Sequence, residues 1–203
     1  MSNIWALGAC LLASATLLPV TAYAQSSVSV TRSILPDQPY TLIYPDIMTA
    51  SGGGADPLTI NHPDAPLQCD VEVVPVVADS TWTPDSALAS FDDTAVAASW
   101  TESFPGFTVA AKGKIAYQSG PALIYDGQST NSPMGVPLTI VHTETVDAAR
   151  GYVLDCLFAT SVAEQVRPIV DFIIANFSTK ADAECCIGAV VAPDPEALAP
   201  PAP

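Results

Sequence analysis

The residues that could perform acid-base or metal chemistry are few in this sequence. It contains 2 histidines, of which His62 precedes Pro63 in an expected loop and His142 ends the apolar face of an expected strand. No serine lies in a G-x-S-x-G nucleophile motif, and no histidine has the His-Glu spacing of zinc hydrolases. We interpret both histidines as surface or edge residues with satisfied hydrogen bonds. The sequence therefore indicates no catalytic residue, no cofactor and no metal site, and a non-enzymatic protein is the preferred interpretation.

The cysteines offer a second kind of chemistry. Outside the N-terminal segment they are Cys69, Cys156, Cys185 and Cys186. In an oxidising compartment an even number favours disulfides, and four cysteines allow three pairings. Cys69 and Cys156 each lie in phase with the apolar residues of a strand, so each is either a buried small hydrophobic residue or half of a core disulfide.

The adjacent Cys185 and Cys186 follow the last expected helix. One of them could attach the chain end to the domain, or the two could join each other in a strained ring. They could also serve a thiol-redox reaction, although such enzymes place a Cys-x-x-Cys motif at a helix start. No C-x2-C spacing supports a metal site.

The N-terminus has the pattern of an export signal. Residues 1–24 contain a long apolar run that ends in Ala22-Tyr23-Ala24, a small-x-small cleavage pattern. We expect this signal peptide to be removed and the mature chain to be periplasmic or secreted. No later segment is apolar over the ~20 residues that a spanning helix needs, so we expect no transmembrane segment in the mature chain.

The charge balance restricts the class of partner. Lys and Arg number 6 against 21 Asp and Glu, which gives a net charge of -15. Nucleic acids and anionic lipid surfaces would repel such a chain, so we expect neither as a partner. The scattered carboxylates are interpreted as a solvated surface that keeps the protein soluble. The more specific alternative is that the carboxylates bind a cationic partner or, weakly, divalent cations.

Hydrophobic periodicity predicts the elements that position these residues. At the centre is Val136–Ser178, two strands and then a helix that opens with the capping box Ser161-x-x-Glu164. An earlier helical segment begins at Thr83-Pro84 and is divided near Asp92-Asp93. The apolar stripe of the last helix is Val162, Val166, Ile169, Val170, Ile173 and Phe177. Residues 107–125 form a hairpin, and short strands precede the first helix.

These patterns predict four regions along the chain. Residues 1–24 are the signal peptide, and residues 25–56 hold N-terminal strands and a Gly-rich linker. Residues 57–180 form a single α+β domain. Residues 181–203 carry the Cys185-Cys186 pair and a disordered Pro/Ala-rich tail.

The order of elements resembles the PsbP-like α/β fold family. The resemblance lies in GFTVAAKGKIAY, PLTIVHT, GYVLDCLFA and VDFIIANFS, and it spans about residues 83–178. It implies an α+β fold with an antiparallel sheet covered on one face by an N-terminal-half helix and a long C-terminal helix. Because proteins of this fold act through surfaces without a shared catalytic residue, it also implies a binding or accessory role. No functional residue is carried over.

Two functions follow from these observations. The preferred one is an exported, non-enzymatic binding or accessory protein that uses a surface or groove to bind a protein partner in the envelope or outside the cell. We predict that Trp100, Phe104 and His142 contribute to that surface, since they lie on or near the apolar faces that could border a groove. The alternative is a small exported enzyme or thiol-redox sensor that uses Cys185-Cys186.

Overall fold

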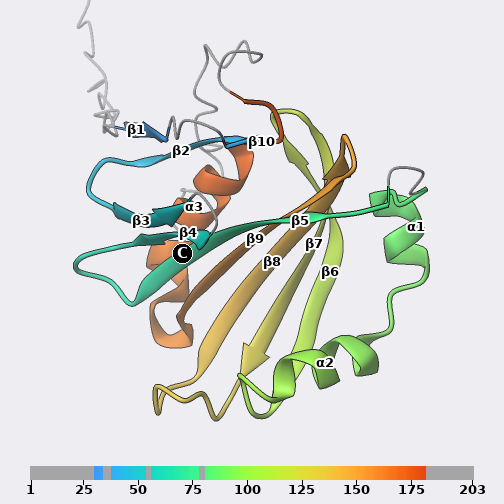
Figure 1. Ribbon diagram of the computed structural model, residues 1–203. Coiled ribbons are helices and arrows are strands. Elements are labelled where there is room, and N and C mark those ends of the chain that lie inside the picture. The colour runs from blue at the N-terminus through green and yellow to red at the C-terminus, as the bar shows by residue number, and fades with distance from the viewer. Residues whose placement is uncertain (1–29, 34–37, 54–55, 78–80, 182–203) are drawn as a thin grey trace, which may run out of the picture.

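The long strands of the protein pair into one antiparallel sheet of 7 strands, in the order β3-β4-β5-β9-β8-β7-β6. The computed structural model describes residues 30–33, 38–53, 56–77 and 81–181, so the expected signal peptide and Cys185-Cys186 lie outside the described residues (Figure 1). The strands of this sheet are β3 Thr49–Gly53, β4 Asp56–Asn61, β5 Leu67–Pro75, β6 Phe107–Tyr117, β7 Gly120–Ser129, β8 Leu138–Asp147 and β9 Arg150–Ala159. A smaller sheet of 3 strands, ordered β1-β2-β10, contains β1 Val30–Ser33, β2 Thr41–Pro45 and β10 Phe177–Ser178.

Two short helices connect β5 to β6. The first, α1 Pro84–Ala89, begins after Thr83, whose side chain accepts a hydrogen bond from the Ser86 amide. The second, α2 Asp93–Thr101, begins after Asp92, whose carboxylate accepts bonds from two backbone amides of the first turn. These caps satisfy amides that have no partner inside a helix. The predicted start at Thr83-Pro84 and the division near Asp92-Asp93 are confirmed.

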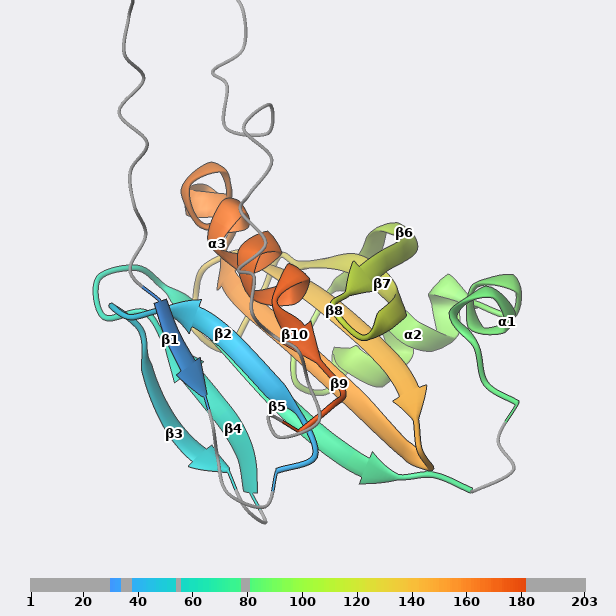
Figure 2. The ribbon, with the colours of Figure 1, turned by 90° about the horizontal axis from the view of Figure 1, so that it is seen from above.

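The two helical segments of the protein pack on opposite faces of the sheet. Val141 and Leu154 pack in the core with α3 Ala163–Ala175, whereas Tyr125 and Ile140 pack with α2. Figure 2 shows α3 beside β1, β2 and β10, with α1 and α2 on the other side of the molecule. The α+β class and the antiparallel sheet with both segments packed on it are confirmed. The prediction that both cover one face is wrong, because neighbouring residues of β8 are buried on both sides.

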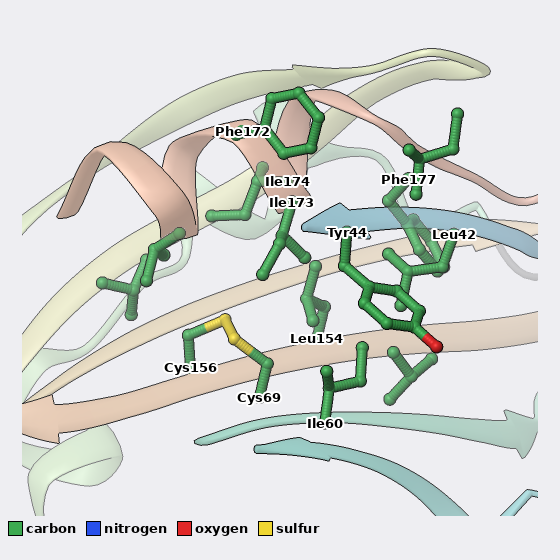
Figure 3. Packing of buried hydrophobic residues seen from close by; sticks show 14 of the residues in the cluster. Leu42, Tyr44, Ile60, Cys69, Leu154, Cys156, Phe172, Ile173, Ile174 and Phe177 are labelled. Carbon is green, nitrogen blue, oxygen red and sulfur yellow. A yellow bond between two sulfur atoms is a disulfide. The ribbon is translucent and has the colours of Figure 1, made fainter. Parts of the chain in front are cut away.

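The larger core lies between the sheet, α3 and β2. Cys69 and Cys156 lie opposite each other in the register of β5 and β9, and their sulfur atoms are joined at 2.06 Å. Figure 3 shows this disulfide beneath α3, among apolar side chains from three layers. The fully buried members of this core include Leu42, Leu58, Ile60, Leu154, Ile173, Ile174 and Phe177. Each large side chain contributes about 1.5–3 kcal/mol when it is fully buried.

The start of α3 differs from the prediction. The chain leaves β9 through a 3-10 turn, Thr160–Val162, and the helix begins after Val162 without a side-chain cap. The capping box of Ser161 and Glu164 is therefore wrong, because the turn places Ser161 inside a helical turn and not before the first helical residue. At the other end, Phe177 belongs to β10 and no longer to the helical stripe. None of the helices in the described part of the chain is long and apolar enough to cross a membrane.

Two glycines of the expected Gly-rich linker belong to a strand. Gly52 and Gly53 belong to β3, which pairs with β4 around a bulge between these two glycines. Both have positive φ angles, of 78° and 87°, which glycine adopts without a steric cost. A Cβ atom on Gly52 would lie 2.2 Å from the carbonyl oxygen of Pro57. The glycines therefore allow the strands to approach closely at the bulge.

Candidate functional site

A row of polar side chains crosses the face of the sheet that α1 and α2 partly cover. The strand register places Thr59, Asp70, Asp155, His142 and Tyr125 side by side on β4, β5, β9, β8 and β7. Since neighbouring strands lie only ~5 Å apart, each side chain of the row can contact the next. Thr59 donates a hydrogen bond to Asp70 at 2.6 Å. We call these five residues the polar row.

His142 is a buried ionisable group at the centre of the charged part of the polar row. Its Nδ1 lies 2.7 Å from Oδ1 of Asp155, and its Nε2 lies 3.6 Å from Oε2 of Glu144, two residues along β8. Its ring stacks on Tyr125 with 4.4 Å between the ring centroids and 19° between the planes. Only 10% of its side chain is exposed. The imidazole is therefore held between two carboxylates and an aromatic ring.

These contacts set the protonation of His142. Burial by itself lowers the pKa of His142, because the imidazolium loses water. The polar contacts and negative charges of Asp155 and Glu144 together outweigh burial and raise the pKa to about 9. Burial also raises the pKa of Tyr125 above its usual value. At neutral pH the site therefore holds an imidazolium and a neutral phenol.

A second group of aromatic residues fixes the position of Tyr125. The indole N–H of Trp100 donates to the Tyr125 hydroxyl at 2.7 Å, and Phe91 meets the Tyr125 ring edge-on at 5.3 Å. Trp100 in turn stacks on Phe107 and contacts Phe104, each with 5.5 Å between ring centroids. Trp100 thus holds Tyr125 in position through a hydrogen bond, and Phe104 packs against Trp100.

An open pocket lies between the two short helices and strands β7 and β8. Its volume is about 430 Å³. Aromatic and small polar side chains line it, together with the two ionisable groups of β8. The lining residues are Trp82, Ser86, Ala87, Ser90, Phe91, Val96, Ser99, Leu123, Tyr125, His142 and Glu144. Its size falls in the range of roughly 300–1,000 Å³ that is usual for ligand sites.

Two lysines of β6 hold the helices that form this pocket. Lys112 lies 2.6 Å from Asp93 of α2, and Lys114 lies 2.5 Å from Asp85 of α1. The ammonium group of Lys112 also lies over the Phe91 ring, 4.7 Å from its centroid. Exposed ion pairs of this kind each contribute about 0–1 kcal/mol, so they orient the helices more than they stabilise them.

One contact beside the pocket resembles part of a catalytic arrangement. The contact between Asp155 and His142 has the form found in Ser-His-Asp hydrolases. The pocket serines, however, donate their hydroxyl groups to backbone carbonyls at 2.8–2.9 Å, Ser86 to Thr83, Ser90 to Ser86 and Ser99 to Val96. Because His142 is already protonated at neutral pH, it does not act as a general base there. The described residues also contain no cluster of ligands that could hold a metal ion.

Comparison with known proteins identifies the fold. No family model matches the chain, and no curated protein sequence matches it. The solution structure of cyanobacterial PsbP (CyanoP) from Synechocystis sp. PCC 6803 matches with a TM-score of 0.53 and 14% identity, over 77% of this chain and 96% of that one. The chain has the Mog1p/PsbP-like fold. The Saccharomyces cerevisiae Ran-binding protein Mog1p matches with a TM-score of 0.52 and 8% identity, over 77% of this chain and 98% of that one.

On this Mog1p/PsbP-like fold the residues singled out in the sequence have different positions. His142 lines the pocket, whereas Trp100 and Phe104 pack beneath it. His62 lies in the loop after β4, where its Nδ1 accepts bonds from the amides of Asp64 and Ala65 at 3.1 and 3.0 Å. Cys69 and Cys156 form the core disulfide.

Other residues of the site were not found from the sequence. Glu144 could have been, because it lies two residues after His142 and so on the same face of the same strand. Asp155 and Tyr125 lie opposite His142 on the two strands that flank β8, so their positions depend on the registers of two strand pairs and not on the period of one strand. Phe91 both packs on Tyr125 and lines the pocket.

Proposed function

We propose that the protein is a non-enzymatic binding or accessory protein that acts in the cell envelope or outside the cell. In this proposal it binds a partner protein through the pocket between the α1–α2 segment and the sheet. The observation that carries the proposal is the pocket itself, which is open, lined by aromatic residues and furnished with polar groups that are positioned but not activated for catalysis. Aromatic side chains are enriched at the centres of protein interfaces.

The geometry of the polar groups supports a binding function in preference to catalysis. The Nδ1 atom of His142 and Oδ1 of Asp155 are hydrogen-bonded at 2.7 Å. The indole N–H of Trp100 donates to the Tyr125 hydroxyl at the same distance. A preorganised surface of this type loses little side-chain entropy when a partner binds. Mog1p, which shares the fold, is itself described as a Ran-binding protein, so a protein of this fold can act by binding another protein.

The disulfide supports the proposed location. Cys69 and Cys156 are joined in the core, and disulfides persist in secreted and periplasmic proteins but are rare in the cytosol. The N-terminal segment has the composition of an export signal. An envelope or extracellular location is therefore part of the proposal.

The proposal is tested by site-specific photo-crosslinking in the native cell. Ser90, an exposed residue at the pocket, is replaced by a photo-crosslinking amino acid, and Glu164, an exposed residue of α3 on the other side of the sheet, serves as the control position. We expect a protein partner to be crosslinked from position 90 and not from position 164. The absence of any crosslinked protein at position 90, or an identical set at both positions, would argue against a binding function of this pocket.

A further inference from the structure

We propose that the pocket beside His142 takes a basic side chain, arginine in preference to lysine, from a cationic segment of the partner protein. This inference rests on the proposed function and states the chemistry of the partner. It is carried by the placement of charge on the face of the sheet around the pocket, by the aromatic walls of the pocket and by the carboxylate of Glu144.

The face of the sheet that continues from the pocket is acidic. Helices α1 and α2 lie over β6 and β7, and the same face of β5 carries Asp70 of the polar row and also Glu72. Strands β4, β5 and β8 contain no lysine or arginine. The lysines of β6 on this face, Lys112 and Lys114, are already paired with aspartates of the helices. A cationic segment that lies across this face would therefore meet Asp70, Glu72 and Glu144, which form no ion pair with a lysine or arginine of the described residues.

The charged group at the edge of the pocket is also negative in sum. The imidazolium of His142 and the carboxylates of Asp155 and Glu144 carry a formal sum of one negative charge, and of these three residues His142 and Glu144 line the pocket. Asp155 forms the short contact to His142, at 2.7 Å. Glu144 is at 3.6 Å from Nε2, longer than a normal hydrogen bond, and 34% of its side chain is exposed. Its carboxylate therefore keeps acceptor positions for a second donor.

The aromatic walls suit a cation with a flat face. Trp82, Phe91 and Tyr125 line the pocket, and the rings of such residues attract ammonium and guanidinium groups placed over them. Phe91 already accepts the ammonium group of Lys112 at 4.7 Å. A guanidinium group combines stacking on a ring with paired hydrogen bonds to one carboxylate, which an ammonium group does not. Arginine is therefore the side chain that uses both features of the pocket.

The test uses the purified full chain and three capped peptides that differ in one residue, which is arginine, lysine or the uncharged citrulline. Binding is followed by NMR through the tryptophan indole N–H signals and the amides of β8. We expect the arginine peptide to bind most tightly and the citrulline peptide at least about tenfold more weakly, since charged hydrogen bonds contribute about 1.5–3 kcal/mol. Glu144→Gln should weaken binding of the arginine peptide by about fivefold to tenfold. Glu164→Gln, which changes the net charge equally on the far side of the sheet, should leave it unchanged.

Two results would overturn the inference. One is equal binding of the arginine and citrulline peptides, and the other is unchanged arginine binding in a Glu144→Gln variant whose near-ultraviolet circular dichroism is native. A partner crosslinked from position 90 whose contact segment is acidic or neutral would also overturn it, while the proposed function would stand. Failure of the proposed function has a different signature, because no partner would then be crosslinked from position 90 whatever the peptides do.

Discussion

The indole N–H of Trp100 on α2 donates a hydrogen bond of 2.7 Å to the phenol oxygen of Tyr125 on β7. This bond joins a short helix to the sheet directly beside His142, because the Tyr125 ring stacks on the imidazole. The position of the ring at the base of the pocket therefore depends on a residue that does not line the pocket.

Replacement of Trp100 by Phe should destabilise the protein by about 1–3 kcal/mol, since it removes a partly buried donor and reduces packing against Phe107. Urea denaturation measures this change. Tyr125→Phe removes the acceptor, and the double variant completes a thermodynamic cycle. We expect the double variant to lose less stability than the sum of the single variants. Strict additivity would mean that the hydrogen bond contributes nothing.

The protonation of His142 should make stability depend on pH. Its pKa is about 9 in the folded protein and ~6.5 in an unfolded chain, so its contribution is complete below pH ~6.5 and is lost as the pH rises through 9. We expect the free energy of unfolding to fall by on the order of 2–3 kcal/mol between these limits. Urea titrations at several pH values measure the slope. His142→Gln should remove most of it, and an equal slope in that variant would assign the effect to other groups.

The part of this site that the sequence predicts is the part that depends on local chemistry. Thr83 and Asp92 reveal the starts of the two short helices, because an N-cap acts on amides only two or three residues away. The phase of His142 on its strand was also predictable, as was the orientation of Cys69 and Cys156 toward a core. Each of these inferences needs only the period of one element.

What the sequence could not predict depends on contacts between distant segments. The pairing of β5 with β9 joins Cys69 to Cys156, 87 positions apart, and places Asp155 beside Asp70. The local motif at Ser161 was overridden because the chain leaves β9 in a 3-10 turn. The glycine-rich composition predicted a linker, but Gly52 and Gly53 lie at a bulge where β3 and β4 approach closely.

The disulfide should be a major source of stability. Replacement of both Cys69 and Cys156 by Ala should lower the free energy of unfolding by about 2–5 kcal/mol, because the unfolded chain regains the freedom of a long loop. Thermal denaturation of the variant measures this loss. Both residues are fully buried, so we also expect a thiol reductant to leave the bond intact until denaturant is added. Rapid reduction of the native protein would contradict the buried position.

Gly127 on β7 should not tolerate a side chain. A Cβ atom there would lie 2.1 Å from the ring of Phe107, which is buried against Trp100. Gly127→Ala should therefore cost about 1–3 kcal/mol, as overpacking of a core does. Gly113→Ala on the neighbouring strand is the matched control, since nothing lies within 4 Å of its Cβ position. Equal stability of the two variants would mean that the Phe107 ring moves aside freely.

Substitutions in the turn between β8 and β9 should stabilise the protein. Ala148 and Ala149 have positive φ angles of 49° and 60°, which alanine adopts at a cost and which Asn-Gly turns adopt readily. The double substitution Ala148→Asn with Ala149→Gly should raise the free energy of unfolding by about 1 kcal/mol. Ala148→Val should lower it, because a β-branched side chain suits this conformation least. Thermal denaturation compares the three proteins, and a stabilising Val substitution would contradict the turn geometry.

The bond between Cys69 and Cys156 also decides how the protein would respond to mechanical force. If the chain were pulled by its two ends, tension would pass from β5 to β9 through the sulfur atoms and would not enter the segment between them. The α1–α2 segment and strands β7 and β8, which line the pocket, all lie in that protected segment. A protein exposed to shear or traction would thus lose its outer strands under load while the pocket carried no tension along the chain.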